Sequence, residues 1–329
     1  MPSSGEVLAT IPVGMQPRWV AITPDGSHAY VTLEDVRLDG PDPGAVAVID
    51  TQASTVTATI VVGSFPSGVV IAPDGRRAYV SNWDSGHGQG VVSVIDTNSG
   101  TVIDSIAVSG QGGGPTGVAI TPNGRHVYVA TDQEAAMPDG QGKVSVIDTA
   151  TSTVIATIRG NPFPSAVTIT PSGDFAYVLD HDGNPEVIDT ATHEPTFPLE
   201  GVLQANGRMA FTPDGLHAYV VSDSIDSVEV LEVATHRLVT LIDVFGGDTT
   251  DVAVTPDGRH VYLTQRPGES SQLRPVTVID TATQKIIGTP VTWSGSADGL
   301  AIMPDGSKSY VADRRSRAVH VVSVQPETA

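Results

Sequence analysis

Three features of this 329-residue sequence predict an all-β chain folded as a seven-bladed β-propeller with four-stranded blades. A Pro-[Asp/Asn/Ser]-Gly element recurs along the chain at intervals of 42 to 49 residues, which indicates a repeat architecture. Apolar and β-branched residues alternate around each element, without helical periodicity. Four-stranded units repeated around an axis are the blades of a propeller. The repeated prolines are Pro24, Pro73, Pro122, Pro171, Pro213, Pro256 and Pro304.

Each repeat contains four expected strands in a fixed order. The first is a short apolar run before the proline, such as 19–22, and it ends in a tight turn where Pro and Gly supply the required backbone angles. The second contains a Tyr-Val pair, as at Tyr30. The third ends in Val-Ile-Asp-Thr, as at 48–51, and the fourth is rich in Thr, Val and Ile, as at 56–62. We expect the repeated aspartates to accept backbone N–H bonds in the following turn. They are Asp50, Asp96, Asp148, Asp189 and Asp280.

The N-terminal segment is expected to close the ring. The seventh repeat, 299–324, supplies only three strands, and residues 7–13 match the fourth strand of the other repeats. Strand 7–13 should therefore be the outer strand of the last blade, so that the first and last blades bury their facing sides. Residues 1–329 then form one domain. Its repeats are about 14–62, 63–108, 109–158, 159–203, 204–244, 245–291, and 292–324 with 7–13.

Composition excludes several classes of function. The net charge of −20 disfavours nucleic acid and anionic membranes as partners, although it is compatible with cation binding. The absence of cysteine excludes disulfides, thiolate metal sites and a cysteine nucleophile. No apolar run is long enough to cross a membrane as a helix, and Met1 to Glu6 does not look like a signal peptide. We expect a monomer, with no membrane insertion, in a compartment that the sequence leaves open.

The repeat resembles the YVTN family of seven-bladed β-propellers over about residues 7–324. The second repeat is the most similar, with Tyr-Val-Ser-Asn at 79–82 and Val-Ser-Val-Ile-Asp-Thr at 92–97, whereas 177–180, 219–222 and 230–233 depart from the pattern. The resemblance implies a propeller of a kind often secreted or surface-associated in bacteria and archaea; a cytoplasmic location stays open. It transfers no catalytic residue. Related seven-bladed propellers include lactonases, lyases and dehydrogenase subunits as well as interaction scaffolds.

A propeller of this kind has two unlike faces. The Pro-Asp-Gly turns and the turns after Ile-Asp-Thr should share one face, here called the bottom. The top face carries the loops between second and third strands and the connections between blades. These vary in length and composition, and variable loops on a rigid frame are where binding usually occurs.

The residues that begin each innermost strand should ring the top mouth of the channel. Most are small, and the exceptions are Arg18, Trp19, Arg208, Asp251 and Asp298. One interpretation is a polar pocket in which two arginines hold a carboxylate. The alternative is a pair of ion pairs between neighbouring blades, Arg18–Asp298 and Arg208–Asp251. Further ligand-binding candidates in the top loops are Trp83, Arg266 and Arg314. The aligned pairs are Arg18/Trp19, Ser67/Gly68, Thr116/Gly117, Ser165/Ala166, Gly207/Arg208, Thr250/Asp251 and Asp298/Gly299.

Two histidines, His87 and His181, fall in top-face loops, whereas the other histidines occupy repeat or strand positions expected to be structural. Paired with Asp180 or Asp182, they are candidates for acid–base catalysis. The same Asp180-His181-Asp182 stretch could instead supply ligands to calcium, although it lacks EF-hand spacing.

Three functional hypotheses remain open from the sequence. The first is a binding propeller that holds a small ligand or a partner protein at its top face. The second is an enzyme, such as a lactonase-like hydrolase, a lyase or a cyclase, with its active site at the top of the channel. The third is a scaffold whose acidic loops bind calcium. Whether the protein is an enzyme is not decided by any motif in the sequence.

Overall fold

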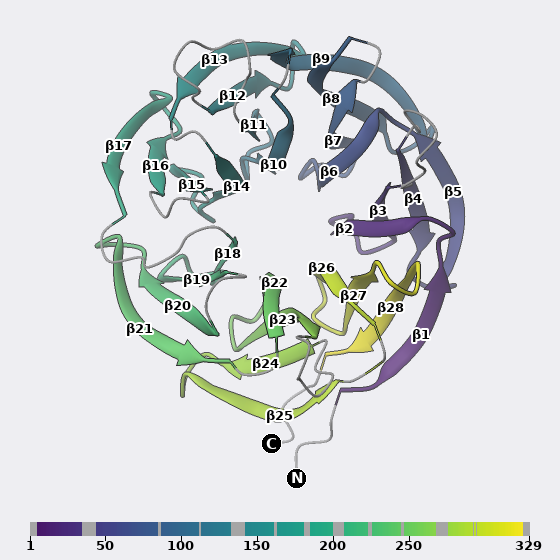
Figure 1. Ribbon diagram of the computed structural model, residues 1–329, viewed down its shortest axis with the longest axis vertical. Helices are drawn as coiled ribbons and strands as arrows, with labels where there is room; N and C mark the ends of the chain where they lie inside the picture. Colours follow the sequence, from purple (N-terminus) through teal and green to yellow (C-terminus); the bar gives the residue numbers. More distant parts are fainter. Residues whose placement is uncertain are drawn as a thin grey trace.

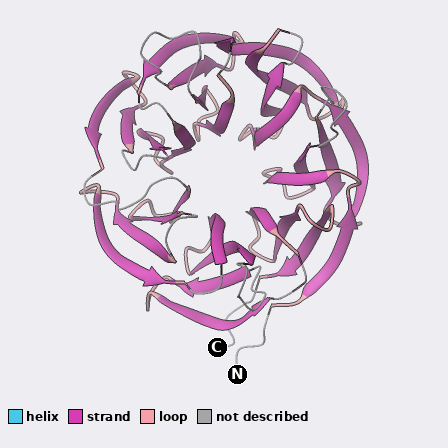
Figure 2. Ribbon diagram, viewed as in Figure 1, coloured by secondary structure: helices cyan, strands magenta, loops and turns pink. Residues whose placement is uncertain are grey.

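The computed structural model describes residues 5–34, 44–84, 87–111, 113–132, 142–160, 163–180, 185–199, 207–222, 226–244, 247–267, 276–291, 293 and 295–324. In Figure 1 its strands form seven antiparallel sheets of four strands, arranged as a ring around a common axis. Figure 2 shows strands and turns, with no helix, across the described residues. The predicted all-β, seven-bladed propeller is therefore confirmed. No helix in this part of the chain is long and apolar enough to span a membrane.

The strands follow the predicted order within each blade. Blades 1 and 2 consist of β2 (Gln16–Ile22), β3 (His28–Glu34), β4 (Ala45–Asp50) and β5 (Thr55–Val61), then β6 (Ser64–Ile71), β7 (Arg77–Asp84), β8 (Gln89–Asp96) and β9 (Thr101–Gln111). Blades 3 and 4 consist of β10 (Pro115–Ile120), β11 (His126–Thr131), β12 (Lys143–Asp148) and β13 (Thr153–Arg159), then β14 (Pro164–Ile169), β15 (Phe175–Asp180), β16 (Glu186–Asp189) and β17 (Glu194–Pro198). Blades 5 and 6 consist of β18 (Arg208–Phe211), β19 (His217–Val221), β20 (Ser227–Glu232) and β21 (Arg237–Asp243), then β22 (Gly247–Val254), β23 (His260–Pro267), β24 (Val276–Asp280) and β25 (Lys285–Val291). Blade 7 consists of β26 (Ala297–Ile302), β27 (Lys308–Asp313), β28 (Ala318–Ser323) and the N-terminal β1 (Val7–Pro12).

The interfaces between blades form the core. Each pair of adjacent blades encloses one cluster of buried Val, Ile, Ala and Leu side chains. The repeated tyrosine is buried in these clusters and reaches the neighbouring blade. The Tyr128 hydroxyl lies 2.7 Å from His193 Nδ1 in the next blade, and the Tyr310 hydroxyl donates to the Thr51 carbonyl at 3.2 Å. A tyrosine at this repeat position therefore ties successive blades together as well as filling the core.

The repeated aspartates organise the bottom-face turns as the sequence predicts. Asp50 Oδ1 accepts the Ala53 N–H at 2.7 Å, and Asp148 Oδ1 accepts the Thr151 N–H at 2.8 Å. Such bonds stabilise the ionised carboxylate. Hydrogen bonds within these turns accordingly lower the pKa of Asp148 below its ordinary value. In the Pro-Asp-Gly turn of blade 1, bonds from Thr23 and Ser27 lower the pKa of Asp25 to about 2.

The ring closes through strand β1. It pairs antiparallel with β28, so that Thr10 lies opposite His320 and Ile11 lies opposite Val319. The predicted outer strand of the last blade is thus present, and it brings the two ends of the chain into one sheet (Figure 1).

A buried polar network reinforces this closure. Asp313 is fully buried at the end of β27, and its Oδ2 lies 3.1 Å from His320 Nε2. The opposite ring nitrogen of His320 lies 3.1 Å from the Thr10 hydroxyl on β1, and Trp293 Nε1 donates to the same Asp313 oxygen at 2.9 Å. Although burial opposes ionisation, hydrogen bonds from His320, Ser296 and Ser316 lower the pKa of Asp313. The network therefore joins the first strand of the chain to the last blade through an ionised carboxylate.

Replacing Asp313 with Ala should lower the free energy of unfolding by about 2–4 kcal/mol, because a buried carboxylate and several donors lose their partners. Urea unfolding followed by circular dichroism measures this change. Asp104→Ala is the matched control, since Asp104 is exposed on the outer strand β9 and should change stability by less than about 0.5 kcal/mol. Equal effects of the two substitutions would show that the network does not hold the ring closed.

Acid should destabilise the protein between about pH 4 and pH 2. The folded-state pKa values of Asp25 and Asp148 lie below the value of about 3.9 expected in the unfolded chain. The unfolded state therefore takes up protons first, and the stability that these groups contribute is lost as the pH falls through this window. Urea unfolding at a series of pH values tests this, and a stability that stays constant down to about pH 2 would contradict it.

Candidate functional site

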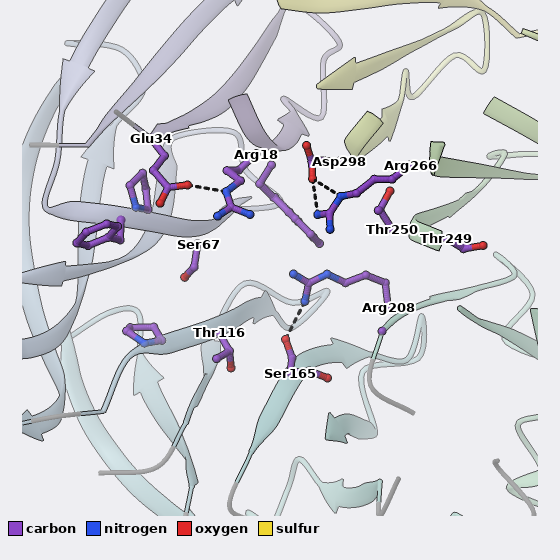
Figure 3. A pocket seen from close by; sticks show the side chains of 15 residues that line it. Arg18, Glu34, Ser67, Thr116, Ser165, Arg208, Thr249, Thr250, Arg266 and Asp298 are labelled. Carbon is purple, nitrogen blue, oxygen red and sulfur yellow. Dashed lines mark hydrogen bonds and ion pairs between the residues drawn. The ribbon is translucent and has the colours of Figure 1, made fainter. Parts of the chain in front are cut away.

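A cavity of about 410 Å³ lies where the seven innermost strands begin. Every blade contributes at least one residue to it, and Figure 3 shows the side chains of Arg18, Arg208 and Arg266 projecting toward its middle. A volume of this size suits a small molecule. The lining residues are Arg18, Trp19, Glu34, Phe65, Pro66, Ser67, Pro115, Thr116, Ser165, Gly207, Arg208, Thr249, Thr250, Arg266 and Asp298.

The close approach of adjacent innermost strands explains why most repeats carry a small residue at the second of the aligned positions. A Cβ atom on Gly299 would lie 2.3 Å from the Arg18 carbonyl oxygen, and one on Gly117 would lie 3.0 Å from the Ala166 Cα. The three repeats with a larger residue at this position differ. Trp19 and Arg208 line the cavity, whereas Asp251 stays buried between β22 and β26, where it accepts the Leu300 N–H.

Arg208 has the most distinctive environment in the cavity. Its guanidinium carbon lies 4.3 Å from the centre of the Trp19 ring, a cation–π contact, and its Nη1 donates to the Ser165 carbonyl oxygen at 2.8 Å. Desolvation lowers the pKa of Arg208, which the charge of Asp251 opposes. An arginine nevertheless stays protonated at physiological pH. The residue is therefore a fixed, half-buried cation between Trp19 and the wall of blade 4.

The other two arginines are paired with carboxylates. Arg18 Nε donates to Glu34 Oε2 at 2.7 Å, whereas Arg266 donates to Asp298 Oδ1 through Nε at 3.0 Å and Nη2 at 2.5 Å. In place of the Arg18–Asp298 ion pair that the sequence suggested, Arg18 pairs with Glu34 and Arg266 pairs with Asp298. The reason is strand geometry: Glu34 ends β3, the neighbour of β2 in the same sheet, and Arg266 lies on β23, which packs against β26 of blade 7.

Asp251 lies buried beside the cavity and does not line it. Its two carboxyl oxygens accept backbone N–H bonds, from Val252 at 2.9 Å and from Leu300 at 2.7 Å. Burial raises the pKa of Asp251 to about 7, although the charge of Arg208 and the two backbone bonds lower it. The suggested Arg208–Asp251 interaction thus acts through charge, while the hydrogen bonds of Asp251 go to the backbone.

The remaining predicted site residues lie elsewhere. Among the described residues, Trp83, His87, Asp180 and Arg314 do not line the cavity. His87 is exposed between β7 and β8, Asp180 is buried at the end of β15, and Arg314 Nε donates to Gln16 Oε1 at 2.6 Å. His181 and Asp182 lie outside the described residues. The two described residues of the predicted acid–base set, His87 and Asp180, are therefore not brought together at the cavity.

Several lining residues were missed from the sequence, chiefly Glu34, Phe65, Pro66, Pro115 and Thr249. Glu34 looked like the start of a long top loop, and the others precede the aligned positions. Phe65 carried no signal that singled it out, because the same Phe-Pro-Ser run occurs at 65–67 and 163–165. No group of three or more His, Asp or Glu side chains in the described part of the chain could hold a metal ion. Calcium binding by the Asp180–Asp182 stretch remains an untested prediction.

Comparisons with known proteins support a propeller without assigning an activity. The model of the family "Lactonase, 7-bladed beta-propeller" matches residues 5–137. A solved structure of hydrazine synthase from Kuenenia stuttgartiensis has 21% sequence identity and a TM-score of 0.75, over 94% of this chain and 96% of that chain. At this identity the likeness shows the shared fold alone. The chain matches no curated protein. The resemblance is thus supported at the level of seven-bladed propellers, and membership of the YVTN family remains a prediction.

Asp251 should make stability depend on pH between about 4 and 7. Because its folded-state pKa of about 7 exceeds the value of about 3.9 in the unfolded chain, the folded protein binds this proton more tightly. The contribution is fully present below about pH 4 and is lost as the pH rises toward 7.

The test compares urea unfolding of the wild type with Asp251→Asn across this range. The variant removes the titrating group, so its unfolding free energy should fall less steeply with rising pH, even though it loses one acceptor for a backbone N–H. Parallel curves for the two proteins would show that Asp251 does not titrate in this window.

Proposed function

We propose that the protein binds small organic anions, carboxylates above all, in the cavity at the channel mouth. The observation that carries the proposal is the state of Arg208. Within the described part of the chain, Arg208 donates to a backbone carbonyl, whereas Arg18 and Arg266 each hold a side-chain carboxylate. A guanidinium with unused donors in a concave, half-desolvated site is well suited to a carboxylate.

The charge balance of the cavity supports this proposal. Three arginines and two carboxylates, Glu34 and Asp298, line it, which leaves one positive charge. Asp251 behind the wall subtracts less than a full charge near neutral pH, because burial raises its pKa to about 7. An acidic protein with a net charge of −20 thus keeps a locally positive pocket. Such a pocket favours a compact anion over a polyanion, which the outer surface would repel.

A second candidate is hydrolysis of a lactone. The observation that favours it is the match of residues 5–137 to a family model named for lactonases. Opening a lactone adds water across the ring ester and produces a hydroxy acid, whose carboxylate is the group that Arg208 would hold under the binding proposal. Glu34 and Asp298 are the described carboxylates at the cavity, and both are engaged by arginines. Release of acid from a panel of lactones, followed with a pH indicator, would distinguish an enzyme from a binding protein.

Binding of small carboxylates should depend on Arg208. Isothermal titration calorimetry with a panel of small carboxylates is expected to detect binding to the wild type and a loss of at least about 100-fold in affinity for Arg208→Gln. The loss follows because Gln cannot supply the positive charge or the paired donors.

Arg314→Gln is the matched control, because Arg314 belongs to a top-face loop and does not line the described part of the cavity. It should bind as the wild type does. Undiminished binding to Arg208→Gln would refute the assignment of the anion site, as would an equal loss in both variants. Thermal unfolding of each variant checks that the fold is intact.

A further inference from the structure

The cavity has an apolar wall opposite its charged one. Arg208 and Arg266 come from blades 5 and 6, whereas Phe65 and Pro66 come from blade 2 and Pro115 from blade 3. Figure 1 places the innermost strands of blades 2 and 3 (β6 and β10) across the axis from those of blades 5 and 6 (β18 and β22). A molecule that fills the cavity can therefore contact Arg208 and Arg266 on one side and flat apolar rings on the other, with the Arg18–Glu34 pair of blade 1 next to the apolar side.

Phe65 differs from its counterpart in blade 4, Phe163, in two ways. Phe65 is 58% exposed, against 38% for Phe163, and of the two only Phe65 adopts a positive φ, of 49°. Non-glycine residues adopt this left-handed conformation infrequently, and bulky ones do so under strain. Of the other described non-glycine residues with positive φ, all but Arg317 lie in bottom-face turns between the third and fourth strands; Arg317 lies in the top-face turn between β27 and β28. Those in the bottom-face turns are Ser54, Ser152, His193, His236 and Gln284.

In the described part of the chain, no residue aligned with Phe65 shares its positive φ. Phe65 lies within an irregularity in the pairing of β6 with β7, between Ser64 and Gly68, and such an irregularity recurs at the start of the innermost strand in five other blades. A strained backbone that leaves an aromatic ring exposed at a cavity is typical of a site that gains contacts when a ligand binds.

We propose that the ligand of this cavity is a small monocarboxylate that carries an apolar ring, with its carboxylate on Arg208 and its ring against Phe65. The proposal rests on the proposed binding of small anions and adds the chemical class of the ligand. One carboxylate is expected because two of the three lining arginines already hold Glu34 and Asp298. A ring is expected because Phe65 and two prolines offer flat surfaces on which a ring stacks.

The test compares three probes by isothermal titration calorimetry: acetate, phenylacetate and the 2-phenylethylammonium cation. Phenylacetate should bind at least about tenfold more tightly than acetate, because it alone can place a carboxylate on Arg208 and a ring against Phe65. The cation carries the same ring with the opposite charge, and it should not bind measurably. Two substitutions then examine the ring contact. Phe65→Asn removes the ring while keeping a residue that tolerates positive φ, and Phe65→Tyr retains it.

We expect Phe65→Asn to weaken the binding of phenylacetate by about tenfold and to leave the affinity for acetate unchanged. Phe65→Tyr should bind both probes as the wild type does. Leu216→Asn is the control, because Leu216 is 57% exposed in the bottom-face turn of blade 5. It should change neither affinity.

Different failures can be told apart. Equal affinities for acetate and phenylacetate, both lost in Arg208→Gln, would overturn the ring site and leave the anion site standing. Undiminished phenylacetate binding to Phe65→Asn would also overturn the ring site. Binding of the cation would overturn the assignment of the charge, and binding of no probe would overturn both proposals.

Discussion

The close approach of the innermost strands is the constraint on which this structure depends. Neighbouring blades come so near to one another at the channel that a Cβ atom on Gly299 would meet the backbone of Arg18 and Trp19. A small residue at this repeat position lets the strands pack. Larger residues at this position either line the cavity, as Trp19 and Arg208 do, or are buried between two strands, as Asp251 is between β22 and β26. The spacing between innermost strands therefore also limits which repeat positions can carry side chains that line the cavity.

The innermost strands approach one another in this way only in a closed ring, and several interactions keep the ring closed. Each hydrophobic cluster lies between two blades, so an open ring would expose two blade faces to water. Strand β1 prevents this by pairing with β28, and the contact is reinforced by Thr10, His320 and Asp313. Tyrosines such as Tyr128 add a bond from one blade to the next. The mouth of the channel is consequently a rigid assembly of seven short strand ends.

How much of this could be predicted follows from the range of the interactions involved. The strands, the number of blades and the closure by residues 7–13 could be predicted because they follow from a local sequence repeat. The alignment of the repeats also placed Arg208 at the channel mouth. The partners of the arginines were not predictable in the same way. Glu34 meets Arg18 because β3 runs beside β2, and Arg266 meets Asp298 across the boundary between blades 6 and 7. An alignment of repeats shows which residues share a level of the ring, but not which neighbours reach them from adjacent strands. The left-handed backbone of Phe65 was likewise invisible, since no glycine marks it.

The protein can be acidic as a whole and still have a positively charged cavity, because the residues responsible for the two charges lie in different parts of the structure. Several of the acidic residues are exposed aspartates in the bottom-face Pro-Asp-Gly turns, where backbone N–H groups and solvent stabilise them, as at Asp25. At the channel mouth, two carboxylates are neutralised by arginines, and Asp251 is buried where its ionised form is disfavoured. Arg208 is left as the cation whose charge no adjacent carboxylate cancels in full, and Trp19 stacks on its face. The same burial that makes Asp251 a poor anion thus strengthens the attraction of Arg208 for one supplied from outside, because both effects come from excluding water from this part of the ring.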